Sequence, residues 1–240
     1  MICPFSTDLP PYAYSLPQIF YTITMAEDKW PQLREILEST DNNDILPTNR
    51  PLHVYMFYRN YLNNIRSKLW KNQNLARWGK WEHYFEHDEF QNRGTIHTHS
   101  FAYTKKKIPE LIHLNLIRVN VPDPNTEPEL YRLVTIFQIH YCDHKCGGPT
   151  SNGEQCSKGF SQPLSQITYC SPNTLRYVYR HTKEEDRMVI PYHPETLLIW
   201  REHINFQYIT ITGFAKYITK YVTKAEPSEL FDIDENDEYR

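Results

Sequence analysis

The chain has 240 residues, 40% of them hydrophobic, which suffices for one packed core with a substantial insertion but falls short of two full domains. Its formal net charge of −3 depends on the segment from Glu226 to Arg240, which holds seven acidic residues and one basic residue; residues 1–225 carry +3, so global charge neither supports nor excludes nucleic-acid binding. The sequence contains no run of the roughly 20 apolar residues that a membrane span needs, and its N-terminus has neither the basic nor the apolar region of a secretory signal.

The first third of the chain predicts a strand followed by two helices. Residues 1–16 are rich in Pro and Tyr and are interpreted as an arm. Residues 18–25 are β-branched and aromatic, which is typical of a central strand. Apolar residues at helical spacing predict a helix over 30–37 and a longer one over 51–71 that begins at a proline.

A β-hairpin is predicted next. Strands over 80–91 and 95–103 are joined by Asn92-Arg93-Gly94, a three-residue loop with Gly at its left-handed position. Arg93 at the tip is interpreted either as a phosphate contact or as a solvated residue. A short helix is predicted over 108–114, and the run Lys105–Lys107 before it is interpreted as a solvated turn, with DNA guidance as the alternative.

The last third predicts a helix over 194–203, a strand over 206–211 and a helix over 213–224 that Thr212 caps. The order of elements predicts an α+β fold, a central antiparallel sheet backed by helices. Four tryptophans are assigned to the core rather than to base stacking: Trp70, Trp78, Trp81 and Trp200.

The segment from Glu89 to His99 carries the sharpest functional pattern. Alternate side chains of a strand point the same way, so His97 and His99 share a face. The hairpin register sets Glu89 opposite His97, and Gln91 on the same face is the alternative third ligand. Two imidazoles and a carboxylate leave coordination positions open, as a catalytic metal ion requires.

The predicted final helix places Tyr217 and Tyr221 one turn apart on one face. An adjacent stripe suits phosphate oxygens and consists of Lys216, Lys220 and Lys224. The alternative is ordinary amphipathic packing of both tyrosines. A phenol with a pKa near 10 is a poor nucleophile unless it is activated, and a cation on the scissile phosphate supplies that activation.

A second metal site is predicted in the glycine-rich segment 140–162. Thiolates and imidazoles at short spacing are ligands of tetrahedral Zn²⁺, and the favoured set is Cys142, His144, Cys146 and Cys156, with His140 as the alternative to His144. An odd total of five cysteines favours metal binding in a reducing compartment over a disulfide framework. The alternative is a reduced loop with incidental cysteines.

Five blocks in order resemble the HUH (two-tyrosine) endonuclease domain of Helitron rolling-circle transposases. They are PQIFYTITMAEDKWPQL (17–33), EFQNRGTIHTH (89–99), CSKGF (156–160), VIPYHPETLLIWREHINFQYI (189–209) and KYITKYVTK (216–224). Thr98 departs from the pattern, since a hydrophobic residue is usual between the two histidines.

The resemblance implies an HUH endonuclease fold, related to RRM-like sheets, and a chemistry. A metal ion on His97, His99 and Glu89, expected to be Mg²⁺ or Mn²⁺, polarises the phosphate of single-stranded DNA. Tyr217 or Tyr221 attacks it and forms a 5′-phosphotyrosine link that a later 3′-hydroxyl reverses. Zn²⁺ on the cysteine–histidine segment is structural.

The predicted organisation is an arm (1–16), the endonuclease domain (17–225) and an acidic linker (226–240). The resemblance implies transposon ends and target as DNA partners, a downstream helicase domain in the full-length protein, nuclear localisation and no membrane. Competing interpretations are a viral or plasmid replication initiator and an inactive zinc-stabilised DNA-binding module. His203 and Asn205 are further candidates near the site, with ordinary packing as the alternative.

Overall fold

The computed structural model describes residues 16–26, 29–40, 46–72, 74–75, 77–90, 95–143, 146 and 156–222. Within the last helix, the description of residues 216–218 and 220–222 covers the backbone alone. The predicted N-terminal arm, except residue 16, and the acidic tail therefore lie outside the described residues. Among the helices that are described, none is long and apolar enough to cross a membrane.

The elements are, in chain order, β1 (Ile19–Thr24), α1 (Pro31–Thr40), η1 (Pro47–Asn49), α2 (Pro51–Ile65), η2 (Arg66–Trp70), β2 (Trp81–Phe90), β3 (Ile96–Thr104), α3 (Ile108–His113), α4 (Pro128–Phe137), β4 (Tyr169–Cys170), β5 (Tyr177–Val178), η4 (Glu184–Met188), α5 (Pro194–Trp200), β6 (Ile204–Tyr208) and α6 (Ile211–Val222).

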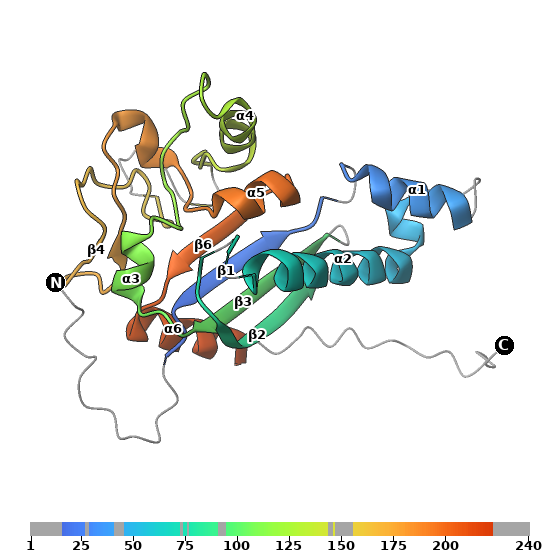
Figure 1. Cartoon of the computed structure of the whole chain (residues 1–240), viewed down its shortest axis with the longest axis horizontal. Coiled ribbons are helices and arrows are strands. Elements are labelled where there is room, and N and C mark those ends of the chain that lie inside the picture. Colours follow the sequence, from blue (N-terminus) through green and yellow to red (C-terminus); the bar gives the residue numbers. More distant parts are fainter. Residues whose placement is uncertain are drawn as a thin grey trace.

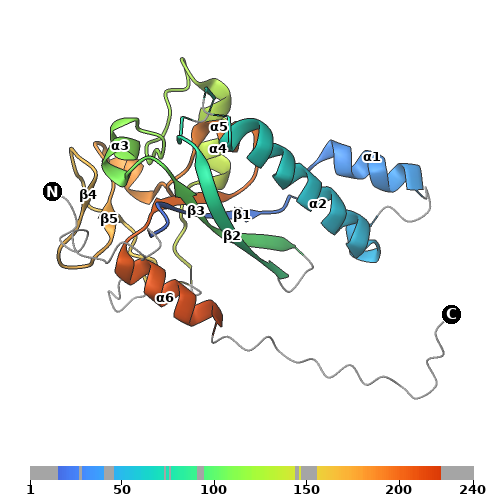
Figure 2. The ribbon, with the colours of Figure 1, turned by 60° about the horizontal axis from the view of Figure 1, so that its bottom comes forward.

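Four antiparallel strands form the central sheet, in the order β2-β3-β1-β6. Figures 1 and 2 show α2 on one face of this sheet and α6 on the other. A separate two-stranded sheet pairs β4 with β5. The predicted α+β fold with a central antiparallel sheet backed by helices is thus confirmed.

The core lies between the sheet and α2. In β1 the residues Ile19, Tyr21 and Ile23 are fully buried and alternate with less buried neighbours, because successive side chains of a strand point to opposite faces. From the other side, α2 buries Tyr58 and Leu62 at the spacing of one helical turn. The four tryptophans assigned to the core are all buried, as predicted.

The predicted helix over 51–71 forms in two parts. Pro51 stands at its first position, where the missing N–H costs nothing. At Arg66 the α-helix gives way to a single π-helical turn, which brings Arg66, Leu69 and Trp70 into the buried layer. The spacing of apolar residues predicted the length of this helix but not the π turn.

Two boundaries in the last third differ from the prediction. The helix predicted over 194–203 ends at Trp200, because Arg201 adopts a left-handed conformation with φ +60° and its N–H closes the helix on Leu197. The strand that follows covers 204–208 rather than 206–211. It begins earlier because Ile204 is fully buried opposite Ile23 of β1.

The predicted capping role of Thr212 is wrong. The helix α6 begins at Ile211, and the hydroxyl of Thr210 accepts a hydrogen bond of 3.1 Å from the N–H of Gly213. The carbonyl of Thr210 also accepts from the N–H of Phe214. Thr210 is held in turn because its hydroxyl donates to the carbonyl of Leu175 at 2.7 Å, a long-range contact that local sequence does not reveal.

The buried His193 should make the stability of this fold depend on pH. It caps α5 by accepting a hydrogen bond from the N–H of Thr196, and burial, with the charge of Arg77, lowers its pKa to about 3. An unfolded histidine titrates near 6.5, so the unfolded state binds more protons between these values. The free energy of unfolding should be at its full value above about pH 6.5 and fall steadily toward pH 3.

Urea unfolding measured across this pH range tests the prediction. His193→Asn keeps a capping side chain but has no imidazole to titrate, so its stability should fall less steeply. Parallel pH profiles for both proteins would show that another group controls the loss.

Candidate metal and nucleophile site

Two histidines of β3 and two residues of β2 share one face of the sheet. Glu89 pairs with His97 and His87 pairs with His99, and directly opposed residues project to the same side. The ring centroids of His97 and His99 lie 4.5 Å apart, and His99 Nε2 lies 3.3 Å from Glu89 Oε2. The structure therefore brings together the three residues predicted from the hairpin register.

The surroundings of His97 keep its imidazole neutral. Burial, together with His99 and His203, lowers the pKa of His97 to about 4, although the Glu89 carboxylate acts in the opposite direction. Its Nδ1 lies 2.9 Å from the hydroxyl of Thr24 on the neighbouring strand, which orients the ring. A neutral, oriented imidazole is the form that binds a metal ion.

His87 is the residue that sequence reasoning missed. It lies two residues before Glu89 on β2, so strand alternation alone predicts that it shares the face of the metal candidates. His203, which was considered beside ordinary packing, lies close enough to His97 to affect its pKa, while its own Nδ1 lies 2.9 Å from the carbonyl of Phe137. The site face thus carries more imidazoles than the H-x-H pattern indicates.

Behind the histidines, Thr98 joins the two hairpin strands to α2. Its hydroxyl donates to Asp88 at 2.6 Å and lies 2.5 Å from the hydroxyl of Tyr58. Asp88 also accepts from Tyr55 at 3.1 Å and from Arg59 at 3.3 Å. This explains the hydroxyl residue between the histidines, because a hydrophobic side chain offers no hydrogen bond to this partly buried carboxylate.

Glu86 extends this layer one step along β2. Its carboxylate accepts hydrogen bonds from Tyr21 at 2.9 Å and from Arg59 at 3.1 Å, and it pairs with the buried Arg66 of η2. Arg59 bridges Glu86 and Asp88. The arginines and tyrosines therefore fix the position of β2 relative to the helix layer, and with it the pairing of Glu89 and His97.

Helix α6, whose sequence includes Tyr217 and Tyr221, lies against the face of the sheet that carries His97 and His99. We call this face the histidine face. The ring of Phe214, in the first turns of α6, contacts Phe101 of β3 edge-on with centroids 5.0 Å apart. Phe101 lies two residues after His99, so it projects from the same face, and Phe20 of β1 contacts both Phe101 and His99. Figure 2 shows α6 running along this face from the β4–β5 side toward the β2–β3 turn.

Several predicted residues fall wholly or partly outside the description. Gln91, His144 and Lys224 are not described. For Tyr217, Tyr221, Lys216 and Lys220 the backbone of α6 is described and the side chains are not. Their predicted roles therefore stay predictions.

The second candidate site gathers one histidine and three cysteines. The ligand atoms of His140, Cys142, Cys146 and Cys156 all lie within 4.8 Å of one another, and two of the cysteines are buried. His140 Nε2 lies 3.2 Å from Cys156 Sγ. Of the two histidines considered, His140 is thus placed among the thiols, a donor set that suits tetrahedral Zn²⁺.

The backbone around Cys156 favours a thiolate. Burial raises the pKa of its thiol, but the N–H groups of Phe160 and Lys158, together with His140, lower it to about 6. Gly159, at φ +79°, closes the turn that aims these groups, because its N–H bonds the carbonyl of Cys156 at 2.7 Å. Burial and its neighbours Cys156 and Cys146 raise the pKa of Cys142 to about 11.

The cysteines differ in state across the chain. Cys142, Cys146 and Cys156 carry free thiols, as metal binding requires. Cys170 in β4 is disulfide-bonded, which differs from the expectation that the cysteines stay reduced. The count of five did not separate the two kinds, because pairing depends on which cysteines the fold brings together.

The first part of the chain is similar to one known protein family. Residues 11–102 match the family described as the Helitron helicase-like domain at the N-terminus. This region spans β1 to most of β3, so the similarity to that family covers Glu89, His97 and His99. No individually curated protein matches the chain.

Thr98 offers a test of the layer behind the histidines. Thr98→Val removes one short hydrogen bond from the Asp88 carboxylate and one from the Tyr58 hydroxyl, so the free energy of unfolding should fall by about 1–3 kcal/mol. Thr98→Ser keeps the hydroxyl and loses one methyl group, for a loss of about 1 kcal/mol. Urea unfolding at neutral pH measures both; a Val variant as stable as the Ser variant would contradict the role of the hydroxyl.

The cysteine–histidine group predicts bound zinc. The purified protein should contain one equivalent of Zn²⁺, and a strong chelator should release it and lower the melting temperature. Cys156→Ser should reduce zinc content to near zero, since a structural site needs its four ligands. Cys170→Ser, a cysteine outside the group, is the matched control and should keep the metal; elemental analysis that finds equal zinc in both variants would exclude the site.

Proposed function

We propose that this chain nicks and rejoins single-stranded DNA by transesterification on tyrosine, as the endonuclease part of a Helitron-type rolling-circle transposase. The observation that carries the proposal is the contact of Phe214 with Phe101, which sets α6 against the face that holds His97, His99 and Glu89. The match of residues 11–102 to a Helitron domain supports the class of protein.

The rotation of α6 supports the role of its tyrosines. Ile211, Ala215 and Thr219 are exposed, recur every four residues and lie on one side of the helix, and Gly213 is exposed as well. Phe214, on another side, contacts the sheet. Positions 217 and 221 lie three and seven residues after Phe214, and this spacing puts them on the same helical stripe. Phe214 contacts the histidine face, so these two backbone positions belong to the stripe of α6 that is nearest to that face.

The residues have distinct roles in the proposed reaction. His97, His99 and Glu89 hold the divalent cation, with His87 as a further donor on the same face. When bound, Mg²⁺ or Mn²⁺ supplies Lewis-acid polarisation of a non-bridging phosphate oxygen. The neutral His97 needs no deprotonation at neutral pH to act as a ligand.

The covalent step conserves the phosphodiester energy. The phenol oxygen of Tyr217 or Tyr221 forms a bond to phosphorus, and the bond from phosphorus to the 3′-oxygen breaks. The phenol loses a proton to solvent and the 3′-oxygen gains one, so the products are a 5′-phosphotyrosine and a free 3′-hydroxyl. Attack by a 3′-hydroxyl reverses the step and joins strands. Two tyrosines allow a second cut while the first strand stays attached.

We also propose roles for the lysines near the end of the chain, for zinc and for a partner domain. Lys216, Lys220 and Lys224 neutralise phosphates beside the tyrosines. Zn²⁺ on His140, Cys142, Cys146 and Cys156 stabilises a polar segment and takes no part in the reaction. The proposed role in transposition also includes a helicase partner domain and a nuclear location.

Incubation of a labelled single-stranded oligonucleotide with the protein and Mn²⁺ tests the reaction. A denaturation-resistant protein–DNA adduct is expected, and Tyr217→Phe/Tyr221→Phe should abolish it. Each of His97→Ala and His99→Ala should slow adduct formation by about 100-fold or more, because each variant removes a ligand of the cation that polarises the phosphate.

Tyr131→Phe is the control for the tyrosine variants, since this residue of α4 is part of neither candidate site. An adduct that survives the double variant would exclude the tyrosines as nucleophiles. Retained single-strand binding without an adduct in the native protein would instead favour a zinc-stabilised DNA-binding module.

A further inference from the structure

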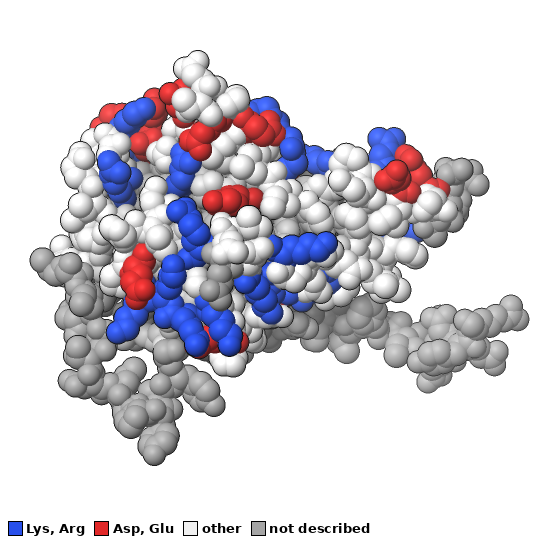
Figure 3. Space-filling model, in the orientation of Figure 1, with Lys and Arg blue, Asp and Glu red and all other residues white. Residues whose placement is uncertain are grey.

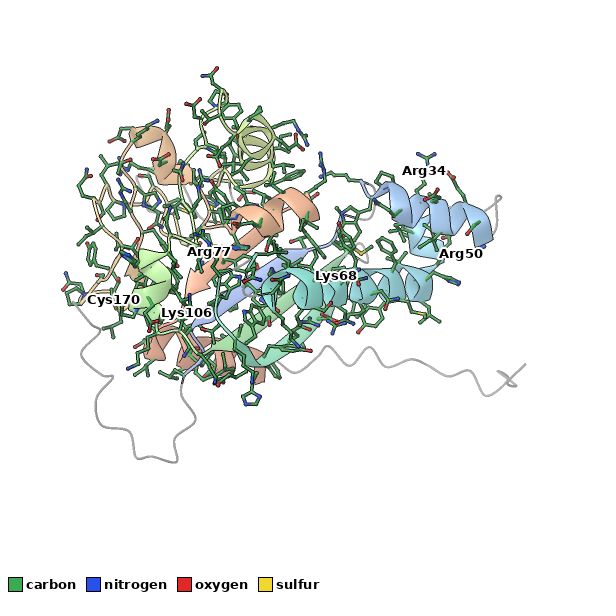
Figure 4. All side chains as sticks on the ribbon, viewed as in Figure 1. Arg34, Arg50, Lys68, Arg77, Lys106 and Cys170 are labelled. Atoms are coloured by element: carbon green, nitrogen blue, oxygen red, sulfur yellow. The ribbon has the colours of Figure 1, made fainter. Side chains whose placement is uncertain are left out.

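Seven cations gather where β2 begins and β3 ends, around the C-terminal end of the long helix. We call them the cationic surface; they are Lys68, Lys71, Arg77, Lys80, Lys105, Lys106 and Lys107. All but the half-buried Lys106 are exposed. Figure 3 shows Lys and Arg side chains concentrated between α3 and the end of α2, and Figure 4 labels Lys68, Arg77 and Lys106 on this side.

Backbone contacts bring the two halves of the cationic surface together. The N–H of Lys105 donates to the carbonyl of Lys80 at 3.0 Å, which joins the turn after β3 to the segment before β2. The stem of Lys106 lies over Gly79, where an added Cβ would come within 3.0 Å of Lys106 Cγ. Gly79 also has φ +81°, a backbone conformation that favours glycine. Its lack of a side chain leaves room for the stem of Lys106.

These cations lack the carboxylate partners that other basic residues have. Within the described part of the chain, none of the seven forms an ion pair, whereas Arg59, Arg66, Arg118, Arg132 and Lys183 each do. Glu110 accepts a hydrogen bond from the backbone N–H of Lys107, not from its ammonium group. The positive charge of this surface is therefore available to an external anion.

The ring of Tyr84 at this surface is 41% exposed but already contacts two cations. Arg66 lies over the ring of Tyr84 at 4.3 Å, and Lys71 lies 5.4 Å from the centroid of the same ring. A single strand binds through bases stacked on open aromatic rings, together with charge. At this surface seven cations accompany a ring that two cations already contact, so charge rather than base stacking dominates, which suits the regular phosphate backbone of a duplex.

We infer that the cationic surface binds the phosphate backbone of double-stranded DNA, independently of sequence. Tyr84 pairs with Ala102, which alternates with the histidines along β3, so this surface borders the face of the sheet opposite the metal candidates. Duplex bound there flanks the strand cut on the histidine face. Only this last relation rests on the proposed function; the binding of duplex does not.

Salt dependence of duplex binding tests the inference. Fluorescence anisotropy with a 20-base-pair duplex, without added divalent ions, gives the dissociation constant from low to physiological salt. Lys71→Gln/Lys80→Gln/Lys105→Gln should weaken binding by at least about 10-fold at low salt and reduce the slope of log affinity against log salt by about 2–3.

A second triple variant has the same charge change elsewhere. Arg34→Gln/Arg132→Gln/Lys183→Gln removes three exposed cations that are each paired with a carboxylate, so its duplex affinity and salt slope should stay close to those of the native protein. Equal losses in both variants would mean that net charge alone decides binding, and the inference would fail.

A single strand of equal length separates the two substrates. If the cationic variant loses single-strand affinity as strongly as duplex affinity, the assignment to duplex is overturned. Duplex binding does not require cleavage. Failure of the native protein to form the covalent adduct would therefore reject the proposed nicking reaction but not duplex binding by the cationic surface.

Discussion

The pairing of β2 with β3 is the constraint on which the candidate site depends. Opposed pairs in this hairpin set Glu89 against His97 and His87 against His99, so one register decides which side chains meet. A shift of one residue would turn the set to the other face. The carboxylates of Glu86 and Asp88 hold the register from behind, through hydrogen bonds and ion pairs to α2, η2 and β1.

The two faces of the sheet consequently have different chemistry. One face packs on α2 with Tyr21, Tyr58 and a layer of satisfied charges, which makes it rigid. The other face carries imidazoles beside Phe101 and receives α6 through Phe214. Support on one side and a docked helix on the other would place the proposed metal ligands and the proposed nucleophiles on separate elements. The cysteine–histidine group lies outside the central sheet.

Much of this organisation was predictable because it follows from local periodicity. Alternation along β3 and the short hairpin loop gave the face of His97 and His99 and the position of Glu89. The same alternation would have revealed His87. Helix α6 was predicted within two residues at each end, and its cap was misassigned because Thr210 is held by Leu175, a contact made between distant segments.

By itself, the sequence determined the four strands of the central sheet, the hairpin register and the candidate ligands of the histidine face, since strand and helix periods act over a few residues. Only the tertiary structure decided which face α6 covers, that Thr98 serves a buried carboxylate, and that His140 stands among the thiols. It also decided that lysines from separate segments form one surface. These features depend on contacts between residues far apart in the chain, where burial and charge pairing rather than local spacing set the energy.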